Sequence, residues 1–309
     1  MRLRLWTVYA TSLLVITGLL VLPAATATTT TSTTANSACG TAEAVPIRHV
    51  VWIWMENRSY SDVMGSSKAP YLTGLAAQCL VATSAHAITH PSAPNYVGAT
   101  GGVPLSKLPA TDCTNCRQPG GSIFTQALSW RVYQESMTTN CRLTKDAGGL
   151  YVVRHNPVTY FTAAKAGCRI DDVPYTRLGP DLAAAPLRQF TFITPNLAHD
   201  MHDGSVSAGD TWLHEQLPAI LSRPEYLDGS TLVFVMWDEG SGGSALKGTD
   251  CTSSSDWSCH VPLVVVGAGL KHASDPTPVS HYDVLATTET LLGVPVLGPG
   301  TPMTLPFAP

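Results

Sequence analysis

The sequence predicts a single α/β domain built around a mainly parallel β-sheet. Four apolar runs rich in β-branched residues are typical of strands buried on both faces, and amphipathic segments of helical period lie between them. Strands that alternate with helices along a chain indicate a parallel sheet covered by helices. Hydrophobic residues make up 44% of the 309 residues and charged residues only 13%, which excludes a disordered chain, a collagen and a coiled coil.

The predicted strands span residues 49–55, 190–194, 231–237 and 261–266. Predicted helices span residues 211–221 and 282–292, where apolar side chains recur on one side, and another helix is expected around residues 70–80. Glycine and proline are spread throughout the sequence, and no linker divides it. We therefore expect one domain over residues 38–309.

The first 27 residues have the pattern of an export signal. Arg2 and Arg4 precede a mostly apolar stretch, and Ala25-Thr26-Ala27 offers a cleavage site with small residues. The alternative is an uncleaved membrane anchor, since the apolar run is about long enough to span a bilayer, but Pro23 favours cleavage. Residues 28–37 form a Thr/Ser-rich tail that we expect to be disordered. The mature chain is then secreted, without stable membrane insertion.

All eight cysteines follow the predicted signal, and an even number in an exported chain indicates disulfides. Pairing neighbours in the sequence predicts Cys39–Cys79, Cys113–Cys116, Cys141–Cys168 and Cys251–Cys259. A zinc site at Cys113-x-x-Cys116 is the alternative, although the sequence has no second Cys-x-x-Cys to complete it.

Polar clusters follow three of the predicted strands. Glu56-Asn57 follows the first, Asn196 to Asp203 follows the second, and Asp238-Glu239 follows the third. Ligands of open α/β sheets bind beyond the carboxyl ends of the strands, so we expect these clusters to converge. Helix capping is the alternative explanation for each cluster taken alone. Convergent carboxylates repel one another, which predicts a divalent metal ion: Zn, Mg, Mn or Ca.

Ser92 lies between two prolines in the segment Thr89-His90-Pro91-Ser92-Ala93-Pro94-Asn95-Tyr96. Because proline fixes φ and disfavours helix in the residue before it, we expect Ser92 on a stiff, extended turn. A hydroxyl held beside a metal ion can lose its proton and attack an electrophile. Taken alone, the segment also fits a proline-rich surface loop.

Six blocks of sequence together resemble the phosphoesterase family, which holds bacterial acid phosphatases and phosphatidylcholine-type phospholipases C. In chain order they are Glu56-Asn57-Arg58-Ser59, Thr-His-Pro-Ser92-x-Pro-Asn95-Tyr, Pro-Asn196-x-x-x-Asp200-Met-His202-Asp203-Gly204-Ser, Gly209-Asp210-x-Trp212-Leu, Trp237-Asp238-Glu239 and Ser280-His281-Tyr. The blocks extend over roughly residues 47–295. The resemblance implies an alkaline-phosphatase-like fold, a three-layer α/β sandwich with a mainly parallel central sheet.

The resemblance also implies roles for individual residues. Ser92 is expected to be the nucleophile, and the metal ion beside it is expected to be held by Glu56, Asn57, Asp238 and Glu239. A second metal site or acid–base groups are expected at Asp200, His202, Asp203 and His281. Asn57 and Asn95 are candidate donors to the substrate, with turn stabilisation as the alternative for Asn95. His281 or His202 is the expected proton donor to the leaving oxygen. His155, His214, His260 and His272 match no block and are expected to be surface or core histidines.

These expectations describe a secreted, metal-dependent phosphomonoesterase that acts through a phosphoseryl intermediate. Its partner is a phosphate-ester substrate, such as a phosphoinositide headgroup, and the chain is expected to be a monomer. A phospholipase C that cleaves phosphodiesters and a non-catalytic metal-binding protein are the alternatives. The formal net charge of −4 argues against a nucleic-acid partner. A classical serine hydrolase is disfavoured because no Gly-x-Ser-x-Gly elbow occurs.

Overall fold

The computed structural model describes residues 37–308. The predicted signal, residues 1–27, and all but the last residue of the predicted tail lie outside the described residues. Most of the described chain folds around one eight-stranded sheet, in the order β5-β4-β6-β1-β7-β8-β2-β9. A two-stranded sheet pairs β10 with β3.

The strands of the large sheet are β1 (His49–Met55), β2 (Leu80–Ala82), β4 (Trp130–Gln134), β5 (Asp172–Pro174), β6 (Phe190–Thr194), β7 (Thr231–Trp237), β8 (Leu263–Val266) and β9 (Ala273–Asp275). The small sheet joins β3 (Ala85–His86) and β10 (Val279–Ser280). The helices are α1 (Tyr60–Val63), α2 (Pro70–Ala76), α3 (Ser92–Gly101), α4 (Ile123–Gln126), α5 (Lys165–Asp171), α6 (Leu178–Ala184), α7 (Val206–Leu221), α8 (Pro224–Leu227) and α9 (His281–Leu291).

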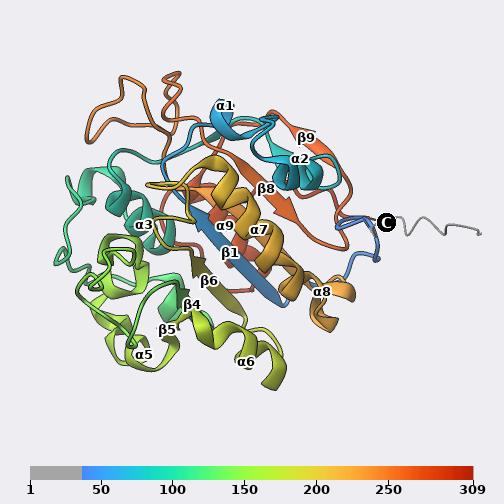
Figure 1. The fold of residues 1–309 in the computed structure, drawn as a ribbon, viewed down its shortest axis with the longest axis horizontal. Coiled ribbons are helices and arrows are strands. Elements are labelled where there is room, and N and C mark those ends of the chain that lie inside the picture. Colours follow the sequence, from blue (N-terminus) through green and yellow to red (C-terminus); the bar gives the residue numbers. More distant parts are fainter. Residues whose placement is uncertain (1–36, 309) are drawn as a thin grey trace, which may run out of the picture. The chain divides into compact units, whose positions relative to one another are not determined.

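The predicted α/β fold with a mainly parallel sheet is confirmed. In the large sheet β1 pairs in parallel with β6 and β7, and β4 pairs in parallel with β5 and β6. Only β8 runs against its neighbours, β7 and β2. Helix α7 crosses one face of the sheet and α9 lies behind it, which gives three layers (Figure 1). Helix α2 packs with α7, and α3 packs with α9.

The predicted elements match the observed ones closely where burial dictates the pattern. Strands β1, β6 and β7 have the predicted bounds, and every residue of β6 and β7 is buried. The last predicted strand begins two residues later than expected, at Leu263. Helix α7 begins at Val206 rather than residue 211, because the Ser205 hydroxyl accepts a hydrogen bond from the Ala208 N–H and caps the helix.

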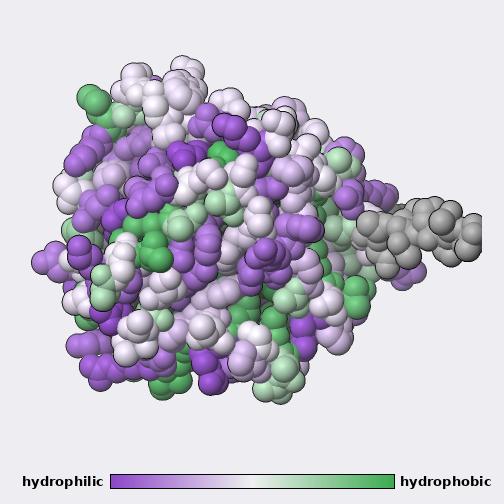
Figure 2. Space-filling model, viewed as in Figure 1, coloured by the Kyte–Doolittle hydropathy of each residue, from purple (hydrophilic) through white to green (hydrophobic). Residues whose placement is uncertain are grey.

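The apolar side chains are concentrated in this interior. Trp52, Trp54 and Trp237 are fully buried in the central strands, and Trp52 donates a hydrogen bond from Nε1 to Thr288 of α9. The face seen in Figure 2 is mostly hydrophilic, with hydrophobic residues in small separate patches. No helix among residues 37–308 combines the length and hydropathy required to cross a bilayer.

All four predicted disulfides are confirmed: Cys39–Cys79, Cys113–Cys116, Cys141–Cys168 and Cys251–Cys259. The alternative zinc site at Cys113 and Cys116 is therefore not supported, because both sulfur atoms are in a disulfide. Four disulfides are typical of a protein that folds in an oxidising compartment.

Candidate active site

The strand register brings two of the acidic clusters together. Strands β1 and β7 are parallel neighbours, with Met55 opposite Trp237, so Glu56 and Asp238 leave the sheet side by side. The Asn57 N–H donates a 2.9 Å hydrogen bond to Asp238 Oδ1, where Asn57 takes a positive φ of 51°. The two strand ends are thus joined directly at the carboxyl edge of the sheet.

The third cluster reaches the same edge from the other side of β1. Strand β6 pairs with β1, and the turn that follows it carries Asp200 back to the strand end. There the Glu56 N–H donates a 2.8 Å hydrogen bond to the Asp200 carbonyl. The convergence predicted for the three strand ends is therefore present.

Ser92 lies against these carboxylates, although not on an extended turn. The expectation of an extended turn is wrong: Ser92 is the first residue of α3, and Pro91 occupies the N-cap position. Helix α3 tolerates Pro94 in its first turn because N–H groups there have no intrahelical partner. Ser92 Oγ donates to Glu56 Oε2 at 3.2 Å and lies 3.4 Å from Glu239 Oε1.

Asn95 stabilises the segment that leads into helix α3. Its Oδ1 accepts hydrogen bonds from the Ile88 and Thr89 N–H groups, at 2.8 and 3.1 Å. Its Nδ2 donates to the Thr89 and Pro91 carbonyls. Because both ends of the amide are occupied, the structure favours turn stabilisation over contact with substrate.

Four carboxylates are buried around Ser92. Glu56, Asp200 and Asp238 are fully buried and Glu239 is 6% exposed. Burial raises the pKa of all four, and the neighbouring charges of Asp238 and Asp200 raise the pKa of Glu56 further. The pKa of Glu239 rises to about 7. Asp200 Oδ2 and Asp238 Oδ2 have no hydrogen-bond partner.

Among residues 37–308, no Lys or Arg forms an ion pair with these four carboxylates, and His90 pairs with Glu239, so the charges of Glu56, Asp200 and Asp238 are not balanced by a cationic side chain. Buried, unpaired carboxylates of this kind cost several kcal/mol each in a low-dielectric interior. A divalent cation is the simplest neutralising group, and oxygen donors suit several such ions. The residues present therefore fit a metal ion.

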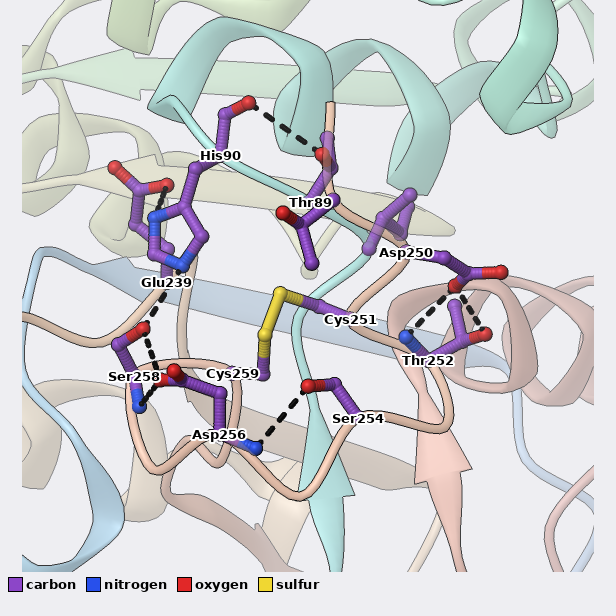
Figure 3. Close-up of a disulfide and its surroundings, with 12 residues drawn as sticks. Thr89, His90, Glu239, Asp250, Cys251, Thr252, Ser254, Asp256, Ser258 and Cys259 are labelled. Carbon is purple, nitrogen blue, oxygen red and sulfur yellow. Dashed lines mark hydrogen bonds and ion pairs between the residues drawn. A yellow bond between two sulfur atoms is a disulfide. The ribbon is translucent and has the colours of Figure 1, made fainter. Parts of the chain in front are cut away.

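A chain of polar contacts links Glu239 to the surface. His90 Nδ1 lies 2.7 Å from Glu239 Oε2, and His90 Nε2 lies 3.3 Å from Ser258 Oγ, which donates to Asp256 Oδ1. Figure 3 shows the His90 imidazole between Glu239 and Ser258. Burial lowers the pKa of His90, but the hydrogen bond and charge of Glu239 outweigh it and raise that pKa overall.

The loop that carries Ser258 also supports the backbone segment before Ser92. The Cys251–Cys259 disulfide lies beside it in Figure 3. The Cys251 N–H donates to the Ile88 carbonyl, and the Ala87 N–H donates to the Cys259 carbonyl. The disulfide loop therefore fixes the backbone that carries His90 and Ser92.

Sequence reasoning missed His155, which was expected to be a surface or core histidine. It is 2% exposed, with Nε2 3.3 Å from Glu56 Oε1 and Nδ1 3.5 Å from Asp200 Oδ2. Burial lowers its pKa well below the usual value, with the Arg154 and His202 charges adding to the effect, so the imidazole is neutral. Glu56, His155 and His202 each offer a ligand atom within 4.8 Å of the others.

Tyr96 was also missed as a site residue. Its hydroxyl donates to Glu56 Oε1 from within helix α3, and its ring stacks on His155. Burial and the charge of Glu56 raise the Tyr96 pKa well above the usual value, so the hydroxyl keeps its proton. Tyr96 therefore fixes the orientation of one carboxylate of the cluster.

Two of the predicted residues do not face Ser92. The side chain of Asp203 is 65% exposed, and its Oδ1 lies 2.7 Å from His202 Nδ1. His281 is buried on Trp54, with Nε2 2.8 Å from the Trp237 carbonyl. Burial lowers its pKa to about 4, so it is a neutral side chain that supports the end of β7. The structure thus gives both residues positioning contacts.

A charged pair lies at the amino end of α3. Asp112 Oδ1 accepts a 3.0 Å hydrogen bond from the Ala93 N–H, and Asp112 Oδ2 lies 3.9 Å from Arg154 Nε. Arg154 Nη2 lies 3.5 Å from His202 Nε2. Asp112 therefore lies between the Arg154 guanidinium and the N–H of the residue that follows Ser92, a position where an anion is favourable.

The fold is similar to that of solved structures from the alkaline phosphatase superfamily. A superfamily member from Vibrio parahaemolyticus has a TM-score of 0.54 at 13% identity, covering 83% of this chain and 68% of its own. The phosphonate monoester hydrolase of Agrobacterium radiobacter has a TM-score of 0.56 at 12% identity, covering 80% of this chain and 74% of its own.

The sequence matches the Phosphoesterase family over residues 66–295, and the chain belongs to that family. It is therefore a hydrolase of phosphoric esters. A phosphatidylinositol-3-phosphatase of Mycobacterium tuberculosis is 29% identical over 265 residues, covering 84% of this chain and 82% of its own. An acid phosphatase of Aspergillus fumigatus is 29% identical over 281 residues and 85% of this chain, which spans 58% of the fungal protein's length.

Proposed function

We propose that this chain is an exported, metal-dependent acid phosphatase that hydrolyses phosphomonoesters, including phosphoinositide headgroups, through a phosphoseryl intermediate on Ser92. The observation that carries the proposal is the contact of the Ser92 hydroxyl with Glu56 and Glu239 inside a group of buried carboxylates. The similarity to a phosphatidylinositol-3-phosphatase supports the substrate class. The four disulfides support an exported protein.

The buried donor set is suited to a divalent cation beside Ser92. The residues that would hold it are Glu56, Asn57, Asp238 and Glu239, because Asp238 Oδ2 lacks a partner and Glu56 and Glu239 face the hydroxyl. A cation bound there supplies Lewis-acid stabilisation of negative charge and lowers the pKa of a neighbouring hydroxyl. His155, His202 and Asp200 form a second group that shares Glu56.

The protein groups support in-line transfer of a phosphoryl group. The Ser92 proton passes to Glu56 or Glu239, whose carboxylates lie within 3.2 to 3.4 Å of Oγ. Ser92 Oγ forms a bond to phosphorus while the bond from phosphorus to the ester oxygen breaks. Water then attacks the phosphoseryl group, releases inorganic phosphate and returns the proton to Ser92.

Two groups outside the carboxylate cluster favour a monoester. A monoester dianion has one more charged oxygen than a diester, and Arg154 and the Ala93 N–H offer donors to it. His202 is the candidate proton donor to the leaving oxygen, since it is half-buried next to Arg154 and contacts Asp203. In this structure the Ala93 N–H donates its hydrogen bond to Asp112 Oδ1, so we propose that a substrate phosphate displaces this carboxylate.

Phosphate release from the purified protein tests the proposal. The substrates are p-nitrophenyl phosphate, a short-chain phosphatidylinositol 3-phosphate, a bis-aryl phosphodiester and phosphatidylcholine. We expect monoester hydrolysis that a chelator abolishes and a divalent metal restores, and at least about a thousandfold loss in Ser92→Ala. Ser207→Ala, which removes an exposed hydroxyl in α7, is the matched control and should keep full activity.

Three results would contradict the proposal. Full activity of Ser92→Ala would show that Ser92 is not the nucleophile. Unchanged activity after exhaustive chelation would show that the reaction does not need a metal ion. Faster release from the diester or from phosphatidylcholine would favour the phospholipase C alternative. Circular dichroism of each variant separates loss of chemistry from loss of the fold.

A further inference from the structure

A separate pocket lies between α5, the Cys141–Cys168 disulfide and the short helix Pro157–Tyr160. Its volume is about 400 Å³, within the range of small-molecule sites. None of the residues that contact Ser92 lines it. The segment that carries Arg154 and His155 at the candidate active site continues into Val158 and Thr159 in the wall of this pocket.

The inner wall of the pocket is apolar. Val158, Phe161 and Cys168 are buried there, and Cys141, the disulfide partner of Cys168, is partly buried. Leu143 also lines the pocket and is 46% exposed, although most large apolar side chains of the described chain are in the core. Apolar surface of this kind gains free energy when an alkyl chain covers it.

The remaining wall carries three cations and no carboxylate. The cations are Arg117, Lys165 and Arg169, and Arg117 is held in place by donation to the Thr159 carbonyl. Lys165 and Arg169 form no ion pair with any carboxylate of residues 37–308.

The acidic residues at the end of α5 are occupied elsewhere. Asp171 pairs with Arg131 at 2.9 Å, and buried Asp172 accepts a hydrogen bond from Asn156. The pocket is therefore a local concentration of positive charge on a chain whose formal net charge is −4. Such a field attracts an anion.

We propose that this pocket is a second binding site, for an amphiphilic anion with one anionic head and a short alkyl chain. The head lies at Lys165 and Arg169, and the alkyl chain covers Val158, Phe161 and Leu143. Exposed cations alone bind a small anion weakly because both partners are well solvated. The combination of charge and apolar surface makes the site selective for a molecule that carries both.

Isothermal titration with octane-1-sulfonate tests the site, because its carbon–sulfur bond is not a substrate for ester hydrolysis. Methanesulfonate supplies the head alone, and octan-1-ol supplies the chain alone. We expect one octanesulfonate to bind per protein, with both partial probes at least about tenfold weaker. The affinity should fall as ionic strength rises.

Variants of exposed residues locate the binding. Lys165→Gln with Arg169→Gln should weaken octanesulfonate binding about tenfold, as expected for two partly solvated charges. Leu143→Ser should also weaken it. The control double variant, Lys107→Gln with Lys271→Gln, removes the same charge from exposed positions outside the pocket and should bind as the wild type does.

Equal affinity of the pocket double variant and the control would overturn the proposal, as would equal affinity for methanesulfonate. Hydrolysis of p-nitrophenyl phosphate should be unchanged in all these variants. The binding result therefore stands or falls separately from the proposed phosphatase activity.

Discussion

Tyr96→Phe removes one hydroxyl from the centre of the candidate active site without opening a cavity. The Tyr96 hydroxyl donates to Glu56 Oε1, and both side chains are fully buried. The variant keeps the ring, and with it the stacking on His155 and the contact with Trp54. Its effect therefore isolates one hydrogen bond to a buried carboxylate.

The expected magnitude follows from the charge and burial of the acceptor. A hydrogen bond to a charged group contributes about 1.5–3 kcal/mol, and Glu56 has no Lys or Arg partner that could replace it. We therefore expect Tyr96→Phe to lower the free energy of unfolding by about 2 kcal/mol at a pH where Glu56 is ionised. Because the hydroxyl also orients a proposed metal ligand, metal affinity should fall by about 10- to 100-fold.

Urea unfolding and metal titration measure the two effects, and Tyr282→Phe is the matched control. The Tyr282 hydroxyl donates a 2.7 Å hydrogen bond to the Val103 carbonyl, a neutral acceptor away from the carboxylates. The control should lose about 1 kcal/mol and keep its metal affinity. Equal metal affinity in Tyr96→Phe and the control would refute the role of Tyr96 in holding Glu56.

Three further predictions concern the surroundings of the site. Burial raises the pKa of Asp172 to about 8, so the folded state retains a proton that the unfolded state loses above about pH 4, and stability falls as pH rises toward 8. In the wild type, the free energy of unfolding measured in urea should fall by on the order of 5 kcal/mol between about pH 4 and pH 8, and Asp172→Asn should abolish this fall. The same fall in the variant would contradict the prediction. Ser258→Ala removes the hydroxyl beside His90, and His90 in turn contacts Glu239. Metal titration should show about tenfold weaker binding in this variant. Unchanged metal affinity would contradict a role for this chain of contacts. A Cβ on Gly240 would lie 2.7 Å from the Ser258 carbonyl oxygen. Gly240→Ala should therefore displace the neighbouring Glu239 and lower kcat/KM by about 100-fold. Wild-type kinetics in this variant would contradict the prediction.

The carboxyl edge of the sheet was predictable because burial leaves a strong pattern in the sequence. Strands buried on both faces read as continuous apolar runs, so the first polar residue after each run marks a strand end. Glu56 and Asp238 were found in this way, and the register of β1 and β7 places them together.

His155 could not be found by the same reasoning. It lies in a short 3₁₀ helix within an irregular, cysteine-containing region, where neither a strand end nor a periodic pattern marks it. Its position depends on long-range packing, since α3 brings Tyr96 against the imidazole ring. The sequence signal was limited to a polar Arg154-His155-Asn156 cluster between apolar residues.

The placement of Ser92 shows a different limit. Prolines on both sides predicted an extended turn, yet proline is also compatible with the first turn of a helix. The structure takes the second option because the Asn95 side chain forms hydrogen bonds with four backbone groups of Ile88, Thr89 and Pro91, just before α3. Local preference allowed both conformations, and the buried amide favours one of them.

The central claim is that Ser92 receives the phosphoryl group, and trapping that group tests it most directly. The protein, loaded with a divalent metal, is mixed with a phosphomonoester, quenched in denaturant at neutral pH within one turnover, digested and analysed by mass spectrometry. We predict one phosphoryl group on the peptide that contains Ser92, and none in Ser92→Ala or after chelation. A phosphoryl group on a histidine, or an active enzyme that never shows an adduct at Ser92, would contradict the account.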